Sequence, residues 1–274
     1  MKLRVGFVGA GAMAEALIRG LIKSGAAPRQ IIASDVQAAR LKYIKSQYGI
    51  KTSANNRSIY ENSDVVVLAV KPQNLEEVLV ELADITQVLT ESVKGLPLIV
   101  SIAAGISIKF VEEALPVPYP VIRAMPNTPA VVGQGATAIS PGSSTRREHE
   151  TQCRSIFEAV GIVVNVPEAQ MDAVTGLSGS GPAYGYVIIE ALADAGVRVG
   201  LPRAVALGLA AQTLAGAAKM VLETGQHPGV LKDQVTSPGG TTIAGLQVME
   251  RGGIRGILMD TVAAAADRSK ELKR

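Results

Sequence analysis

The sequence predicts two domains: an α/β domain at the amino end and an all-helical domain after it. Over the first two thirds, short aliphatic runs alternate with amphipathic segments, a pattern typical of a sheet with helices on both faces. Residues 65–70 form a continuous run of Val, Leu and Ala, as expected of a parallel strand buried on both faces. After about residue 167 the alternation stops, and long segments rich in small residues follow. We therefore predict an α/β domain over 1–166 and a helical domain over 167–274.

The strands and helices of the α/β domain are predicted from where short apolar runs give way to segments with helical spacing of apolar residues. Runs of Val, Ile, Leu and Ala predict strands at residues 3–8, 31–34, 65–70, 98–102, 121–125, 136–140 and 162–166. The segments between them have helical spacing and predict helices at residues 12–24, 36–47, 75–83, 108–115 and 148–160. Gly161 follows the last helix in the position of a C-terminal cap. This order predicts a doubly wound sheet.

The helical domain contains three long segments. Residues 174–197 and 204–224 are largely uncharged, and a third helix is predicted at 253–273. Pro202 lies near the first turn of the second helix, and Gly225 ends it. Helices this apolar usually bury both faces, which favours an intertwined oligomer. A monomeric helical core is the alternative, and composition does not separate the two.

Composition narrows the class of protein. The 274 residues are 47% hydrophobic and 19% charged, so a disordered chain is excluded. The 27 Lys and Arg against 24 Asp and Glu give a net charge of +3, and aromatic residues make up only 3%, which disfavours nucleic-acid binding. One cysteine, Cys153, and two histidines, His149 and His227, exclude an internal disulfide and a thiolate or histidine-rich metal site. These counts fit a reducing, cytoplasmic setting.

Two features resemble targeting signals, but neither has the full pattern of one. The basic and apolar start, followed by the small residues 12–14, mimics a signal peptide, yet Gly6, Gly9 and Gly11 interrupt the apolar run. The longest uncharged stretches, such as residues 124–145, contain several Pro, Gly and polar residues. We therefore expect no membrane-spanning helix.

The most informative local motif covers residues 9–14, which read G-A-G-A-M-A and match the form G-x-G-x-x-A. It lies after a predicted strand and before a predicted helix. Gly9 permits a tight turn, Gly11 lets a pyrophosphate approach the backbone, and Ala14 keeps the helix close to the strand. The free N–H groups and the positive end of the helix dipole then hold the anion. The motif predicts a Rossmann-type dinucleotide-binding domain.

The choice of dinucleotide depends on the end of the second strand. Ser34 and Asp35 lie about 20 residues past the glycines, where an acidic residue would hydrogen-bond the ribose 2′-OH of NAD. Asp35 would repel the 2′-phosphate of NADP, whereas Ser34 could donate to it and Arg40 is nearby. Asp35 could equally be a helix N-cap. The sequence leaves the preference open.

Three blocks in the second half are rich in glycine, proline and hydroxyl residues. Residues 172–184 place many small residues at a helix entrance, and residues 227–233 form a connector. Residues 237–242 read S-P-G-G-T-T and precede a helix-like run. Their backbone N–H groups and hydroxyls could bind a carboxylate at the helix start. The alternative is a packing elbow, in which small residues let helices touch.

Five segments together resemble the Δ1-pyrroline-5-carboxylate reductase family. They are residues 6–11, 69–72, 122–129, 176–183 and 237–242. The resemblance runs from about residue 3 to residue 273, and the last of the five segments is the most specific. The glycine motif by itself is not specific.

The resemblance implies reduction of pyrroline-5-carboxylate to L-proline, the last step of proline synthesis, with NADPH or NADH. The implied cofactor contacts are Val8, Gly9, Ala10, Gly11, Ala12, Met13, Ser34, Val36, Asn56, Ala69, Val70, Lys71, Pro72, Ile102, Ala103, Ala104 and Gln234. The substrate would meet Glu168, Thr241 and Thr242, with Thr242 closest to the imine nitrogen. Family members form dimers through interleaved helical domains, often assembled into decamers, and the resemblance implies a homo-oligomer here.

The residues favour an imine over a ketone substrate. Related two-domain hydroxyacid dehydrogenases, which this chain resembles in layout, place a lysine shortly after a Gly-Ser-Gly run, because hydride delivery to a neutral ketone needs a positioned acid. Here Gly185 occupies that spacing, and no lysine occurs between Lys109 and Lys219. A protonated cyclic imine is already electrophilic and makes lower demands.

The resulting hypothesis is hydride transfer from the nicotinamide to C5 of the imine, driven by geometry and electrostatics. Thr242 is the catalytic candidate that orients the nitrogen, and the amides of Gly240–Thr242 would clamp the carboxylate. Glu168 would balance the iminium charge or occupy a solvated turn. The rivals are a related imine or β-hydroxyacid reductase and a non-catalytic NAD(P)-binding sensor.

Overall fold

The computed structural model describes residues 3–89 and 95–272. The chain divides into two compact units. The sheet unit comprises Met1–Ser180 with Ala264–Arg274, and the helical unit comprises Gly181–Ala263. This division differs from the predicted one at residue 166, because residues 167–180 pack with the sheet. Met171 is fully buried there, and the hydroxyl of Ser269 donates to the buried carboxylate of Asp172 at 2.9 Å.

The sheet unit contains one eight-stranded sheet in the order β3-β2-β1-β4-β5-β6-β7-β8. Its strands are β1 Val5–Val8, β2 Ile31–Ser34, β3 Lys51–Ser53, β4 Val65–Leu68, β5 Leu98–Ser101, β6 Val121–Met125, β7 Gly135–Pro141 and β8 Gly161–Asn165. Strands β1 to β6 are parallel, β7 pairs antiparallel with β6, and β8 pairs parallel with β7. The order reverses between β1 and β4, and crevices at such a reversal are where α/β sheets bind ligands.

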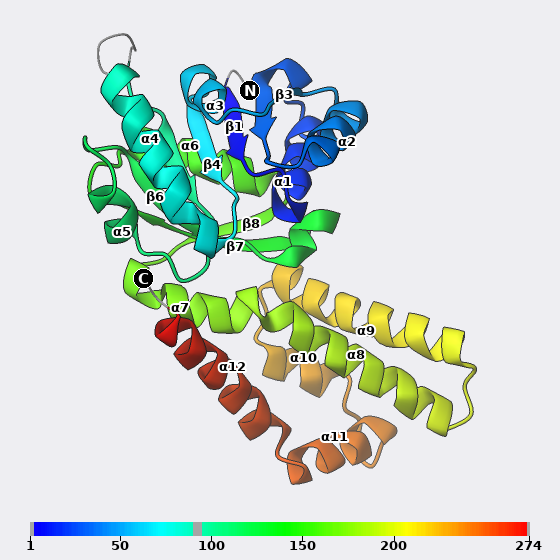
Figure 1. Cartoon of the computed structure of the whole chain (residues 1–274). Helices are drawn as coiled ribbons and strands as arrows, with labels where there is room; N and C mark the ends of the chain where they lie inside the picture. The colour runs from blue at the N-terminus through cyan, green and yellow to red at the C-terminus, as the bar shows by residue number, and fades with distance from the viewer. Residues whose placement is uncertain (1–2, 90–94, 273–274) are drawn as a thin grey trace. The chain divides into compact units, whose positions relative to one another are not determined.

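Helices cover both faces of this sheet (Figure 1). They are α1 Ala12–Lys23, α2 Ala38–Tyr48, α3 Arg57–Asn62, α4 Leu75–Leu89, α5 Ile108–Glu113, α6 Arg147–Glu158 and α7 Met171–Val174. Helices α1, α2 and α6 share one apolar core with the strands, and α3, α4 and α5 share a second. Every described position of β1, β2, β4 and β5 is buried, as the continuous apolar runs of these strands predict.

Short helical turns connect several of these elements. They are η1 Pro28–Gln30, η2 Pro72–Asn74, η3 Thr128–Val132, η4 Glu168–Gln170 and the π-helical turn η5 Thr175–Gly179.

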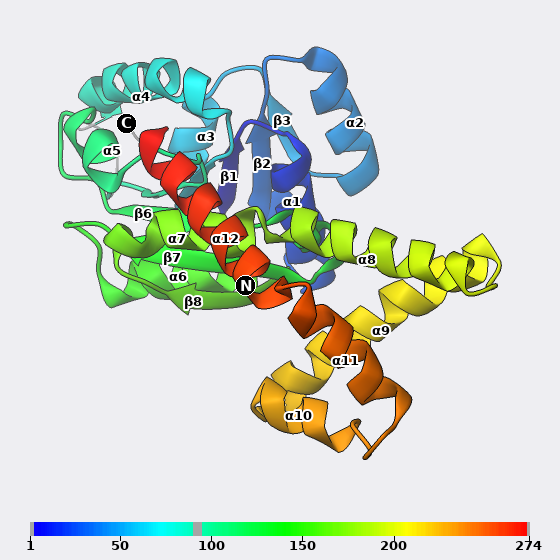
Figure 2. The same ribbon diagram turned by 90° about the horizontal axis from the view of Figure 1, so that it is seen from below.

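The helical unit contains α8 Gly181–Arg198, α9 Arg203–Thr224, α10 Pro228–Gln234, α11 Thr241–Arg251 and the first part of α12 Ile254–Glu271 (Figure 2). Helices α8 and α9 pack against each other through a small core of Ala193, Ala206 and Ala210. Large apolar side chains remain exposed along the same helices; they include Leu207, Leu209 and Leu222. The apolar composition therefore does not build a large core within one chain.

The predicted fold class, a Rossmann-type doubly wound sheet followed by an all-α domain, is confirmed. The sequence-based prediction does not include β3 and α3, which are short. It also treats the residues of α10 as a connector. The helix predicted at 174–197 is interrupted by η5, and residue 273 of the last predicted helix lies outside the described residues. Gly161 is not a helix cap: it opens β8, where a Cβ would lie 1.9 Å from the carbonyl oxygen of Gly135.

Among the described residues, α9 alone is long and apolar enough to cross a membrane by length and composition. One such helix is weak evidence for a membrane span, because core helices of soluble proteins can have the same length and composition. Helices of this kind also occur where two chains pack together.

Candidate dinucleotide and substrate site

The glycine loop between β1 and α1 has the geometry that its motif predicts. Gly9 has φ +93°, a conformation that residues with a Cβ rarely adopt, and a Cβ there would lie 2.8 Å from the carbonyl oxygen of Ala69. The amide of Gly9 donates to the carbonyl of Ser34 at 2.9 Å, and the amide of Ala69 donates to the carbonyl of Val8 at 2.8 Å. The loop therefore lies directly against the ends of β2 and β4.

The start of α1 is open and fits an anion. Gly11 is its N-cap, and no side chain caps the helix. A Cβ built on Gly11 would meet no atom within 4 Å, so a ligand can approach the backbone closely there. Ala14 is fully buried, which keeps α1 close to the sheet. The free N–H groups of this helix start can bind the pyrophosphate of a dinucleotide.

Most of the predicted cofactor contacts gather at one edge of the sheet. The carboxyl ends of β1, β2, β4 and β5 lie in register, and Val8, Ser34 and Leu68 pair there. Residues 69–72 follow β4 and residues 102–104 follow β5, so they begin at the same edge. Val36 projects fully into solvent just after β2. The sheet topology thus brings together segments separated by many tens of residues.

Ser34 and Asn56 form a hydrogen-bonded pair at this edge. The hydroxyl of Ser34 donates to Oδ1 of Asn56 at 2.6 Å, and Nδ2 of Asn56 donates to Glu81 of α4 at 2.5 Å. Ser34 is buried, and Asn56 is the residue that precedes the short α3. These two predicted cofactor contacts are therefore held in fixed orientations.

Asp35 is not the N-cap of α2. That position belongs to Gln37, and the carboxylate of Asp35 instead accepts the amides of Gln37 and Ala10, both at 2.9 Å. The structure thus excludes the alternative in which Asp35 is a helix N-cap. Its carboxylate instead contacts the glycine loop through the amide of Ala10.

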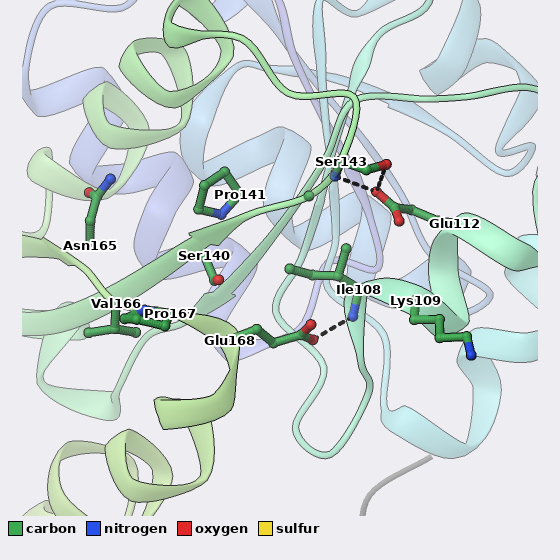
Figure 3. Close-up of a pocket in the computed structure, with 11 residues that line it drawn as sticks. Ile108, Lys109, Glu112, Ser140, Pro141, Ser143, Asn165, Val166, Pro167 and Glu168 are labelled. Atoms are coloured by element: carbon green, nitrogen blue, oxygen red, sulfur yellow. Dashed lines mark hydrogen bonds between the residues drawn. The ribbon is translucent and has the colours of Figure 1, made fainter.

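A pocket of about 600 Å³ lies on the sheet unit between α5, the end of β7 and the segment that follows β8 (Figure 3). Oε1 of Glu168 accepts the amide of Ile108 at 2.6 Å and pairs with Arg123 at 3.3 Å. The Arg123 side chain is 3% exposed, whereas that of Glu168 is 29% exposed. Glu168 is therefore not a freely solvated turn residue.

An apolar pocket of about 500 Å³ adjoins the cofactor edge of the same unit. Pro72, Ala104 and Ile106 form one side, and the last turns of α12 form the other. The carbonyl oxygen of Leu272 would lie 2.9 Å from a Cβ on Gly105, so the end of α12 packs closely on this loop. The pocket thus lies next to the segments that follow β4 and β5.

The S-P-G-G-T-T block forms a tight turn followed by a helix. Gly239 has φ +64°, and the amide of Gly240 donates to the carbonyl of Ser237 at 3.0 Å. Gly240 is the N-cap of α11, and no side chain caps that helix. Since the amide of Gly240 is already bonded, the amides at the start of α11, from Thr241 onward, are the ones open to an anion.

The predicted site residues belong to both units. The predicted cofactor contacts up to residue 104, and Glu168, lie in the sheet unit. Gln234, Gly240, Thr241 and Thr242 lie in the helical unit, where Nε2 of Gln234 donates to Gln226 at 3.2 Å.

Two charged residues near these contacts, Arg123 and Glu15, had no role predicted from the sequence. An arginine inside an otherwise apolar strand is rare unless it is paired, and that signal identifies Arg123. No comparable local signal identifies Glu15, whose partners come from α2.

The fold and the open glycine loop define a dinucleotide-binding oxidoreductase of two units. Residues 4–105 match the model of coenzyme F420-dependent NADP oxidoreductases, and residues 168–272 match the model of pyrroline-5-carboxylate reductase dimerisation. A pyrroline-5-carboxylate reductase of Methanosarcina acetivorans is 49% identical over 98% of this chain and 97% of its own length.

Solved structures agree with these matches. A pyrroline-5-carboxylate reductase of Coxiella burnetii has a TM-score of 0.93 at 38% identity, with each chain fully covered. The Plasmodium falciparum pyrroline carboxylate reductase, solved with NADP bound, has a TM-score of 0.85 at 30% identity, also with full coverage of both chains. The chain belongs to the pyrroline-5-carboxylate reductase family.

Proposed function

We propose that this chain reduces pyrroline-5-carboxylate to L-proline with a nicotinamide dinucleotide, NADP being the cofactor that the relatives support. The observation that carries the proposal is the full-length family match together with the open glycine loop at the sheet reversal. In the reaction a hydride goes to C5 of the imine, and the ring nitrogen keeps a proton and becomes the amine of proline. The reduced nicotinamide supplies the hydride when it is bound.

The cofactor would lie along the edge formed by β1, β2, β4 and β5. The amides at the start of α1 would bind its pyrophosphate, and Ser34, Val36 and Asn56 would face the adenosine ribose. Residues 69–72 and 102–104 would lie along its nicotinamide half, beside the apolar pocket of Pro72 and Ala104. Gln234 of the helical unit would be a further contact of the cofactor.

The substrate carboxylate would be bound by the start of α11. Its uncapped amides and positive dipole end suit an anion, and Gly240 shapes the turn that presents them. The Thr242 hydroxyl would accept a hydrogen bond from the N–H of the protonated imine. No residue in this scheme has to supply a strong acid, because the iminium form is already electrophilic.

Glu168 is the proposed acidic contact of the substrate. Both of its hydrogen bonds use Oε1, and Arg123 compensates part of its charge. Oε2 can then face a cationic ring nitrogen. This position would favour the protonated imine over a neutral ketone.

We further propose a cytoplasmic homodimer that assembles into a decamer. The match to the dimerisation model and the exposed apolar helices of the helical unit support an oligomer. Light scattering should then give ten times the chain mass of 28.4 kDa. A mass of two chains would retain the dimer and remove the decamer.

The first experiment is the loss of NAD(P)H absorbance with purified protein and pyrroline-5-carboxylate. We expect oxidation that depends on the imine and yields proline in equal amount. Oxidation with a β-hydroxyacid's keto form but not with the imine would overturn the proposal. Tight cofactor binding without oxidation of any imine would favour a sensor instead.

A further inference from the structure

Asp35 and Arg40 both hydrogen-bond the backbone of Ala10, at the corner where β1, β2 and α2 meet. Asp35 accepts the amide of Ala10 at 2.9 Å, and Nε of Arg40 donates to the carbonyl of Ala10 at 2.5 Å. In Rossmann-type domains the end of β2 faces the adenosine ribose. Asp35 and Arg40, two of the side chains that could read a 2′-OH or a 2′-phosphate, thus both contact the glycine loop, whereas the third, Ser34, donates to Asn56.

Asp35 has little freedom to change its role. Oδ2 is occupied by Ala10, and Oδ1 accepts the amide of Gln37 at 2.9 Å. Both contacts are to backbone amides that do not move with a rotamer change. The other charged group at this corner has a side-chain partner that a 2′-phosphate could replace.

Arg40 is that group, and Glu15 of α1 holds it. The guanidinium forms an ion pair with Oε2 of Glu15 and lies over the Tyr43 ring at 5.2 Å. The two side chains are only 25% and 22% exposed, so water screens the pair incompletely. Nε and the Nη that donates to Glu15 form one edge of the guanidinium, so Arg40 can turn this edge to a phosphate for a bidentate contact only by leaving Ala10 and Glu15.

Glu15 would still have hydrogen-bond donors if Arg40 left it, because two tyrosine hydroxyls also donate to its carboxylate. The hydroxyls of Tyr48 and Tyr43 donate to Oε1 at 2.8 and 3.2 Å. Burial raises the pKa of Glu15, but the hydrogen bonds from Arg40 and Tyr48 outweigh it, and the pKa lies below its ordinary value. Burial and Glu15 together raise the pKa of Tyr48 to about 12, so its hydroxyl remains a donor.

We propose that Glu15 sets the preference between NADPH and NADH by competing with the 2′-phosphate for Arg40. With NADH the Glu15–Arg40 pair stays intact beside the ribose hydroxyl. With NADPH the guanidinium exchanges the carboxylate for phosphate oxygens, and the two tyrosine hydroxyls keep Glu15 hydrogen-bonded. The inference rests on the proposed function only in taking the site to bind a nicotinamide dinucleotide.

The test measures binding of two nucleotides that differ by the 2′-phosphate alone. Adenosine 2′,5′-bisphosphate and adenosine 5′-monophosphate are titrated by calorimetry into wild type, Glu15→Gln and Glu158→Gln. Glu158 pairs with Arg154 within α6, and its substitution changes the net charge equally. Glu15→Gln should raise the affinity for the bisphosphate about 5- to 20-fold relative to the monophosphate, and Glu158→Gln should change that ratio by less than about 2-fold.

Two further variants test whether the change in relative bisphosphate affinity acts through Arg40. Arg40→Gln in the Glu15→Gln background should remove the gain, because the released cation is gone. Tyr48→Phe should lower relative bisphosphate affinity, since Glu15 then depends more on Arg40. The NADPH to NADH ratio of kcat/KM should follow the same order.

An unchanged affinity ratio in Glu15→Gln would overturn the inference, as would an equal gain in Glu158→Gln. A shifted ratio in a protein that does not reduce the imine would support the inference while overturning the proposed function. Failure of every variant to bind either nucleotide would overturn the dinucleotide site and the inference with it.

Discussion

Most residues of the proposed site fall into two groups according to what their position depends on. Gly9 and Gly11 act through their lack of a side chain, and their roles follow from backbone geometry alone. Glu168, Asp35 and Arg40 act through partners that come from other elements. Thr242 belongs to neither group, because its proposed role concerns the substrate and not a neighbour in the chain.

Replacement of Thr242 by Ala should lower kcat about 10- to 100-fold, because one hydrogen bond to the reacting nitrogen is lost in the transition state. The Kd of NADP should change by less than about 2-fold, since Thr242 is proposed to contact the substrate and not the cofactor. Steady-state kinetics with the imine and titration of the cofactor measure the two effects separately.

Thr242→Ser retains the hydroxyl and should recover most of the turnover. Thr261→Ala is the matched control, because Thr261 donates to the carbonyl of Ile257 within its own helix. An undiminished kcat in Thr242→Ala would remove this residue from the mechanism.

At the scale of elements, helix α1 must lie close to the sheet for its amino end to reach the cofactor edge. Two small residues allow this. Ala14 is fully buried, and Gly20 packs where a Cβ would lie 2.3 Å from Cγ1 of Val160 and 2.8 Å from the carbonyl oxygen of Ala159. The contact joins α1 to the segment between α6 and β8.

Replacement of Gly20 by Ala should destabilise the protein, even though Ala is the better helix former. The helix propensity gains about 1 kcal/mol, but the overpacked contact costs more, so the free energy of unfolding should fall by about 1–3 kcal/mol. Urea unfolding followed by circular dichroism measures the change.

Adding Val160→Ala removes the closest of these contacts and should recover part of the loss. An increase in stability in Gly20→Ala alone would show that α1 can shift without cost, and would contradict the close packing inferred for this helix.

At the scale of the whole molecule, the helical unit exposes many large apolar side chains. Leu209 and Leu222 of α9 are 56% and 68% exposed. The sequence left an intertwined oligomer and a monomeric core as alternatives. Since the helices bury few of their large side chains within one chain, and residues 168–272 match a dimerisation model, the oligomer is favoured.

The double substitution of Leu209 and Leu222 by Lys should therefore reduce the size of the assembly, because buried lysines would lack partners in an interface. Sedimentation velocity over a range of protein concentrations measures this. Val80→Lys is the control, since Val80 is 59% exposed on α4 of the sheet unit. Equal assembly size in all variants would place the interface elsewhere.

Much of the fold could be predicted from local sequence. The strands at 31–34 and 121–125 match their predicted bounds, because each is a short apolar run with polar or proline neighbours. β3 escaped detection since its three residues, Lys51–Ser53, form a partly exposed edge strand with no apolar pattern. The interruption of the helix at 174–197 escaped detection too, because the small residues there are compatible with a continuous helix.

The sequence by itself determined the class of fold, the glycine loop and the family, because each depends on residues close together in the chain or on identity along its length. Only the tertiary structure decided what holds Asp35, Arg40 and Glu168. Asp35 meets Ala10 across 25 positions, and Glu168 meets Arg123 across 45. The physical reason is that the partners of these charged groups depend on which strands and helices the fold brings together. The local pattern of hydrophobic residues does not contain that information.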